Sequence, residues 1–251
     1  MSRIATAAIE QIAKVYNLST NVRATDILRN VNADLPPQAK LVQSILEHSA
    51  MVAMITTFVY ANYSDLFREA GFIIRPEHSS FMGLHHDDPE WWTLDMVPTL
   101  GFRSLSPEEK RRAEQEAMEI LLGPKNRNSL LWQTHDEYEA RVTDDAVFVK
   151  TCDILELFCH NRILASYDVG IITWDNYKTH APEVLQESEQ FLKDHDAAGA
   201  KIPLSIADIL ERIYIEKFKA FGFPPVMADV FFDLTETIRT YPFCDIVRVD
   251  R

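Results

Sequence analysis

Residues 85–99 read His-His-Asp-Asp-Pro-Glu-Trp-Trp-Thr-Leu-Asp-Met-Val-Pro-Thr. The stretch places two histidines and four carboxylates within eleven residues, and apolar residues such as Leu84 and Met96 flank the charges. Solvated charge runs rarely lie against such neighbours, so the stretch is a candidate functional site. His86 and Asp87 together offer an imidazole nitrogen and a carboxylate oxygen, which are ligands that Zn²⁺, Mn²⁺, Fe²⁺ and Co²⁺ prefer. Two ligands do not hold a catalytic metal, so others must come from elsewhere in the chain.

The apolar residues recur at helical spacing along most of the chain, whereas the period-two alternation of strands is scarce. We therefore predict an all-α fold, with a short hairpin near residues 168–174 as the one expected exception. The predicted helices span about 4–16, 39–63, 107–122, 130–142, 144–167, 182–193, 205–221 and 226–241, with a further short helix between 17 and 37.

Composition indicates a soluble globular protein. Of 251 residues, 47% are hydrophobic and 25% charged, and neither a Gly/Ser-rich linker nor a low-complexity stretch is present. We predict a single domain over residues 1–251, with a motif-bearing core at about 40–165 and a helical extension at about 170–251. The net charge of −13 works against binding a nucleic-acid polymer, which needs clustered Lys and Arg. A small anionic substrate stays compatible, since a bound metal inverts the local field.

The sequence also bears on location and redox state. It lacks a run of about 18 apolar residues and a signal-peptide apolar region, so we expect no membrane association and a cytoplasmic location. Cys152 and Cys159 lie on one predicted helix about 10 Å apart, which is beyond bridging distance. Reduced thiols are therefore expected.

Two more ligand-type residues fall on apolar helical faces. His48 lies in the apolar seam of the 39–63 helix, where a satisfied core histidine is the commoner interpretation. Asp153 lies on the buried side of the 144–167 helix, where a carboxylate is costly unless it is paired or ligates a metal. An ion pair with Lys150 or Arg162 is the alternative to ligation.

Taken together, the unusual polar residues form a candidate ligand set drawn from separate helical segments, as a metal site in a bundle core requires. The set comprises His48, His86, Asp87 and Asp153. Two imidazoles and two carboxylates leave coordination positions open for water and substrate. Glu90 follows His86 by four residues, so on a helix its carboxylate would lie one turn along, placed to act on a water.

Three motifs in this order resemble those of the HD-domain superfamily of metal-dependent phosphohydrolases, most closely its bacterial 5′-deoxynucleotidase branch and eukaryotic relatives. The motifs are Glu-His-Ser at 47–49, His-Asp-x-x-Glu at 86–90 with Asp95 and Pro98 following, and Lys-x-x-Asp at 150–153 followed by Leu155-Glu156. The resemblance covers about residues 40–165 and implies an HD-domain helical bundle with extra C-terminal helices.

The resemblance also implies roles. One divalent metal (Co, Mn, Zn, Fe or Mg) would be bound through the four-residue set, and Glu90 and Asp95 would assist hydrolysis of a phosphate ester. The implied substrate is a small phosphorylated molecule, with the 5′-phosphate ester of a nucleoside monophosphate as the leading choice. Lys150, one turn from Asp153, is a candidate phosphate contact, although a solvated or ion-paired lysine fits equally.

This chain also departs from the branch. The branch carries an Arg-Trp pair before the first histidine, whereas here Arg29 is followed by Asn30. Arg29 or Arg23 is the candidate phosphate contact, and Trp91 is either a pocket residue or a packing residue. The extension from about residue 170 has no counterpart in the branch, so the substrate class is left open.

Four rival functions follow from these observations. They are a dNTP triphosphohydrolase, a phosphatase of a non-nucleotide metabolite, a diiron oxygenase on the same scaffold, and a metal-binding scaffold without turnover. A diiron site needs more histidines between Asp87 and Asp153, and His135 is the only one there. A homodimer is a default expectation only.

Overall fold

The computed structural model describes residues 3–6, 9, 45–90, 107–123, 126–166 and 206–241. Its helices are α2 (Ile45–Glu69), α3 (Pro76–His85), α5 (Pro107–Leu122), α6 (Leu130–Ala140), α7 (Asp144–Ser166), α10 (Ile206–Ala220) and α11 (Pro225–Thr240). These described ranges contain no strand, and the predicted all-α class is confirmed. The predicted helix at 182–193, the short helix between 17 and 37 and the hairpin near 168–174 lie outside the described residues.

One predicted boundary needs correction. The first long helix continues past residue 63 to Glu69, because Phe67 extends the buried stripe of Tyr63 by one turn. It ends at Glu69, and Gly71 just beyond it has a φ of 81°, which suits a helix-terminating residue without a Cβ. Helix α3 was not predicted from the sequence; it begins with Pro76 at its first position and leads directly into the His-Asp motif.

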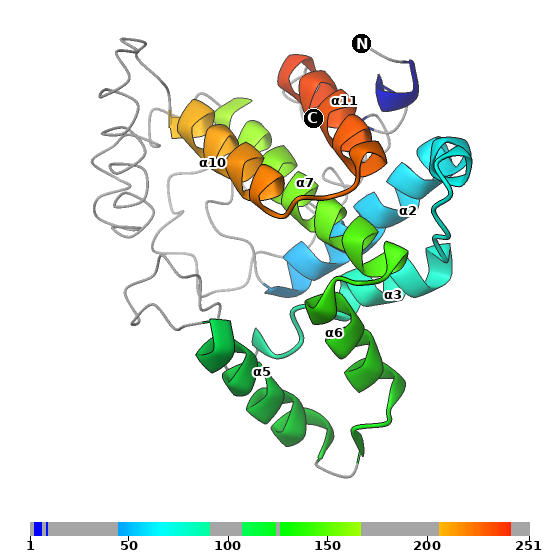
Figure 1. Cartoon of the computed structure of the whole chain (residues 1–251). Helices are drawn as coiled ribbons and strands as arrows, with labels where there is room; N and C mark the ends of the chain where they lie inside the picture. Colours follow the sequence, from blue (N-terminus) through cyan, green and yellow to red (C-terminus); the bar gives the residue numbers. More distant parts are fainter. Residues whose placement is uncertain are drawn as a thin grey trace, which may run out of the picture.

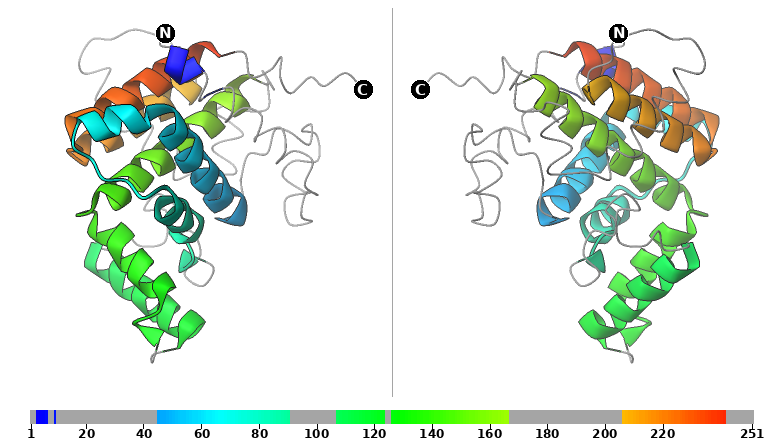
Figure 2. Two further views of the ribbon diagram at one scale, coloured as in Figure 1. Left: turned by 90° about the vertical axis from the view of Figure 1, so that its right-hand side faces the viewer. Right: turned by 90° about the vertical axis from the view of Figure 1, so that its left-hand side faces the viewer.

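Helix α7 is the centre of the bundle. It packs against α2, α3, α6, α10 and α11 (Figure 1). Figure 2 confirms from two sides that α10 and α11 cover one side of α7, while α3 and α6 lie toward the other. Helices α5 and α6 extend together away from the rest of the molecule in all these views.

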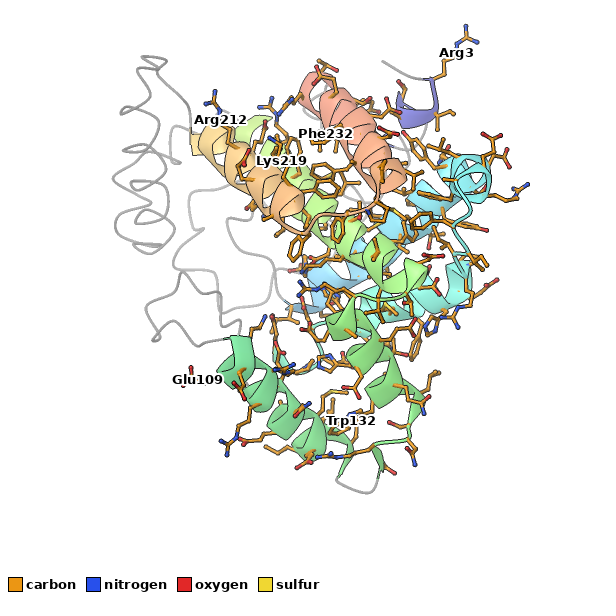
Figure 3. The ribbon with its side chains drawn as sticks, viewed as in Figure 1. Arg3, Glu109, Trp132, Arg212, Lys219 and Phe232 are labelled. Atoms are coloured by element: carbon orange, nitrogen blue, oxygen red, sulfur yellow. The ribbon has the colours of Figure 1, made fainter. Side chains whose placement is uncertain are left out.

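The main core fills the space between α2, α7, α10 and α11. Phe67 meets Phe148 edge to face at a centroid distance of 5.1 Å, and Phe218 stacks on Phe231 at 3.9 Å. Each such fully buried side chain contributes roughly 1.5–3 kcal/mol. Charged side chains such as Arg212 and Glu109 lie on outer surfaces (Figure 3). This core fixes α7 against α2, which carry two of the predicted ligands.

The described helices also test two smaller expectations. Cys152 and Cys159 are both free and buried within α7, and burial raises the pKa of the Cys152 thiol to about 12. None of the described helices is long and apolar enough to cross a membrane.

Candidate metal centre

The four predicted ligands come together where three helices meet. His48 lies in the first turn of α2, His86 and Asp87 follow the last turn of α3, and Asp153 lies midway along α7. Helix α3 approaches α2 closely because Gly83 has no Cβ: a Cβ there would lie 3.2 Å from the Cα of Ala53. This close approach sets the separation of the two imidazoles, whose ring centroids are 5.3 Å apart.

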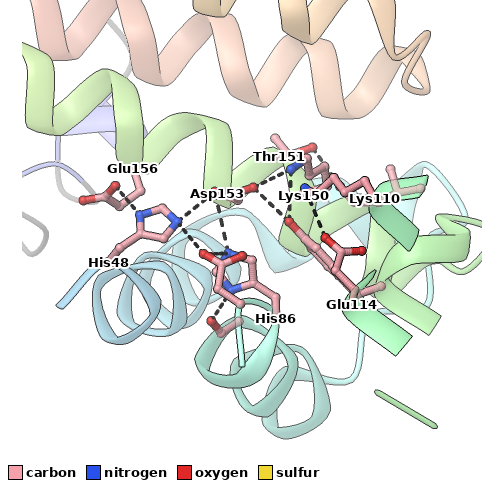
Figure 4. Close-up of polar contacts among 12 residues, drawn as sticks. His48, His86, Lys110, Glu114, Lys150, Thr151, Asp153 and Glu156 are labelled. Carbon is pink, nitrogen blue, oxygen red and sulfur yellow. Dashed lines mark hydrogen bonds and ion pairs between the residues drawn. The ribbon is translucent and has the colours of Figure 1, made fainter. Parts of the chain in front are cut away.

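Both imidazoles direct Nε2 toward the carboxylates (Figure 4). His48 Nε2 lies 3.1 Å from Asp153 Oδ1 and 3.4 Å from Asp87 Oδ2. His86 Nε2 lies 3.1 Å from Asp87 Oδ2 and 3.8 Å from Asp153 Oδ1. Ligand atoms of His48, His86 and Asp87 all lie within 4.8 Å of one another, which is compatible with a single ion.

The donor set fits a divalent cation. His86 Nε2 is buried and, although Asp87 Oδ2 is near, it has no hydrogen-bond partner of acceptable geometry among the described residues. Its Nδ1 is held by the Gly83 carbonyl at 2.8 Å, which leaves Nε2 directed at the centre. A buried nitrogen with neither water nor a hydrogen bond is costly, and a metal ion would satisfy it.

The electrostatics of the centre favour a positive charge within it. Burial would lower the pKa of His86, but Asp87 and Asp153 outweigh burial and raise the pKa to about 9. Burial likewise opposes protonation of His48, yet Glu156 and Asp153 raise its pKa well above the usual value. Without a metal, the carboxylates therefore retain protons on the imidazoles. A cation would replace those protons.

Asp153 is both paired and directed at the centre. Its Oδ1 faces the imidazoles, while its Oδ2 accepts hydrogen bonds from Lys150 Nζ at 2.6 Å and Tyr138 Oη at 2.8 Å. Burial alone would raise the pKa of Asp153, but Lys150 and the imidazoles hold it well below its usual range. The two interpretations considered for this residue, ion pair and ligand, are thus compatible. Arg162 instead contacts Glu211.

The other predicted site residues are less constrained. Glu90 is half-buried at the end of the described stretch, and its N–H donates to Asp87 O at 2.9 Å. Burial would lower the pKa of Lys110 on α5, but Glu114 raises it, with a smaller contribution in the same direction from the Glu90 carboxylate. The predicted catalytic Asp95 and the predicted substrate contacts Arg29 and Trp91 lie outside the described residues.

Two residues that contact the ligand set had no role predicted from the sequence. Glu156 lies one turn after Asp153 on α7, and Tyr138 comes from α6; both are buried. The i, i+3 spacing from Asp153 was a usable signal for Glu156. No comparable spacing indicated Tyr138. His85 pairs with Asp88 at 2.9 Å, away from the four predicted ligands.

A second group of ligand-type residues has a structural explanation. His78, Glu137 and Asp145 also bring ligand atoms within 4.8 Å of one another. However, Arg75 donates to both carboxylates, through Nε to Asp145 and through Nη2 to Glu137. Asp145 Oδ1 further accepts from the Arg75 N–H and from Ser79 Oγ. These donors satisfy the hydrogen-bonding needs of the two carboxylates without a metal ion. The group therefore has a structural role, in which it joins α3 to α6 and α7.

The fold and the centre define an all-helical protein with two imidazoles and two carboxylates converging in its interior. The family model described as HD domain matches residues 28–195, and the chain belongs to that family of metal-dependent phosphohydrolases. The resemblance seen in the three motifs is confirmed at this level. No curated protein and no solved structure matched the chain.

Proposed function

We propose that the chain hydrolyses the 5′-phosphate ester of a nucleoside monophosphate. The observation that carries the proposal is that ligand atoms of His48, His86 and Asp87 lie within 4.8 Å of one another. Asp153 Oδ1 adjoins this group, 3.1 Å from His48 Nε2 and 3.8 Å from His86 Nε2. A divalent metal held there supplies a water of lowered pKa and polarises the phosphoryl oxygens. The nucleotide part rests on the likeness of the motifs at 47–49, 86–90 and 150–153 to the 5′-deoxynucleotidase branch.

The surrounding residues have complementary roles in this proposal. His48 and His86 offer nitrogen lone pairs, and the two aspartates offset the charge of the ion. Lys150 keeps positive charge beside Asp153, where a phosphate dianion would approach. Glu90 accepts the proton of the attacking water, a role that requires hydrogen-bond reach of that water.

A substrate screen tests the proposal. The protein is incubated with nucleoside mono- and triphosphates and with non-nucleotide phosphate esters, while Co²⁺, Mn²⁺, Zn²⁺, Fe²⁺ and Mg²⁺ are added singly. Phosphate release from monophosphates is expected. Release of triphosphate from dNTPs, or cleavage of non-nucleotide esters alone, would overturn the nucleotidase assignment. Bound metal with no turnover on any substrate would indicate a scaffold.

Metal content separates the hydrolase from a diiron oxygenase. One ion per chain is expected, and two irons per chain would contradict the proposal. His135, the one histidine between the His-Asp motif and Asp153, is not among the described residues whose ligand atoms cluster at the centre.

Three variants assign the roles. Asp87→Ala is expected to lose metal and activity together. Glu90→Ala should keep the metal and lower turnover by roughly 10²-fold, as loss of a general base does. Asp88→Ala is the neighbouring control, because Asp88 pairs with His85 rather than with the centre, and it should retain both. Full activity in Glu90→Ala would remove the proposed role of Glu90.

A further inference from the structure

The imidazole of His48 is held at both nitrogens by carboxylates of one helix. Its Nε2 faces Asp153 Oδ1 at 3.1 Å, and its Nδ1 lies 2.8 Å from Glu156 Oε2 (Figure 4). Asp153 and Glu156 are three residues apart on α7, so their side chains project from the same face. Glu156 is fully buried at 0% exposure.

We propose that Glu156 is a positioning residue for the metal centre: it holds the proton of His48 on Nδ1 and presents the Nε2 lone pair to the ion. The inference rests on the proposed metal centre and adds a residue to it. A neutral imidazole carries one N–H, and the acceptor opposite that N–H decides which nitrogen is free to ligate.

The two histidines of the centre are oriented by different acceptors. His86 Nδ1 bonds to the carbonyl of Gly83, whereas His48 Nδ1 bonds to a carboxylate. An anionic acceptor makes a shorter and stronger hydrogen bond and raises the basicity of the imidazole. His48 is therefore expected to be the stronger metal ligand of the two histidines.

The position of Glu156 excludes direct ligation in this arrangement. Its carboxylate lies at the Nδ1 side of the ring, opposite the nitrogen that faces Asp87 and Asp153. Its contribution must then pass through His48. Substitution should weaken metal binding while the four ligands themselves stay in place.

Cobalt binding by the full chain tests this role. Wild type, Glu156→Gln and Glu156→Leu are titrated with Co²⁺ alone, and affinity is measured together with the visible ligand-field spectrum. Loss of such an outer partner typically weakens affinity by about 10–100-fold. We expect the Glu156→Leu protein to lose nearly 100-fold in Co²⁺ affinity, because leucine accepts no hydrogen bond. The Glu156→Gln protein, which keeps a neutral acceptor, should lose nearer to tenfold. Both should show an altered spectrum. Glu114→Gln is the control, since Glu114 is also buried but contacts Lys110 instead.

The outcomes are separable. If the wild type binds Co²⁺ and a folded Glu156→Leu protein binds it with unchanged affinity and spectrum, the positioning role is overturned while the metal centre stands. If the Leu variant does not fold, the Gln variant decides by the same criterion. A wild type that binds no Co²⁺ would overturn the metal centre itself, and the role of Glu156 with it.

Discussion

Gly83 in α3 lies against the backbone of Ala53 in α2, where an added Cβ would be 3.2 Å from both Ala53 N and Ala53 Cα. Backbone atoms cannot move aside as a flexible side-chain end can. The carbonyl of Gly83 also accepts the hydrogen bond from His86 Nδ1. One glycine thus sets both the helix separation and the orientation of a predicted ligand.

Gly83→Ala should therefore weaken the metal centre. Overpacking of this kind costs about 1–3 kcal/mol of stability and pushes α3, with His86, away from His48. Chemical denaturation and Co²⁺ titration should both show a loss. Gly71→Ala is a matched control: its φ of 81° makes it strained, but it has open space around it and lies at the far end of α2. It should lose stability yet bind Co²⁺ normally, and equal Co²⁺ affinities for the two variants would contradict the packing argument.

Tyr138 offers a test of how Asp153 is oriented. Burial, with Asp153 beside it, raises the pKa of the Tyr138 hydroxyl well above its usual value. The hydroxyl therefore stays protonated and donates a hydrogen bond to Asp153 Oδ2. The ring also packs edge to face on His86 at 5.0 Å.

Tyr138→Phe should keep the ring contact and remove only the hydroxyl. Leaving the buried Asp153 with one donor fewer costs about 1–3 kcal/mol, and we expect Co²⁺ affinity to fall by roughly tenfold. Equilibrium denaturation and metal titration measure the two effects. Unchanged affinity would show that Lys150 alone orients Asp153.

The Arg75–Asp145 contact predicts a structural role for the second ligand-type group. Asp145 is 2% exposed and accepts three hydrogen bonds at the start of α3, two of them from Arg75. Asp145→Asn should cost about 2 kcal/mol, since bonds to a charged acceptor are lost. Asp144→Asn, whose bond to the Ile73 N–H is exposed, should cost less. A second equivalent of tightly bound Co²⁺ that Asp145→Asn abolishes would instead reveal a metal site.

The sequence predicted most of the helices and the partners in the centre, because ligand-type residues on apolar helical faces are conspicuous. The prediction of His48 and Asp153 as ligands rests on this pattern. The contact of Glu156 with His48 was not predicted, because the two residues are 108 positions apart. Helical spacing also does not show which imidazole nitrogen faces which carboxylate. Helix α3 was unassigned because it is only ten residues long, and the Arg75 N–H at its start bonds to Asp145, 70 residues away in sequence. A bond to so distant a residue has no local sequence signal.

Glu114 on α5 predicts a pH dependence of stability. It is 4% exposed, and its Oε2 has no hydrogen-bond partner among the described residues. Burial raises the pKa of its carboxyl despite the Lys110 ammonium 3.2 Å from Oε1. A folded-state pKa above the unfolded value means that folding favours the protonated acid. The protein therefore loses stability as the pH rises from the unfolded pKa through the folded one.

Glu114→Gln, which mimics the protonated acid at every pH, should melt at a higher temperature than wild type at pH 7. The difference should vanish in acid, below the unfolded pKa of glutamate at about 4.3. Thermal melts across that range measure it. Glu116→Gln on the same helix, where the side chain is exposed, should follow the wild-type curve. A Glu114→Gln protein that melts below wild type at neutral pH would show that the Lys110 ion pair outweighs the burial of the charge.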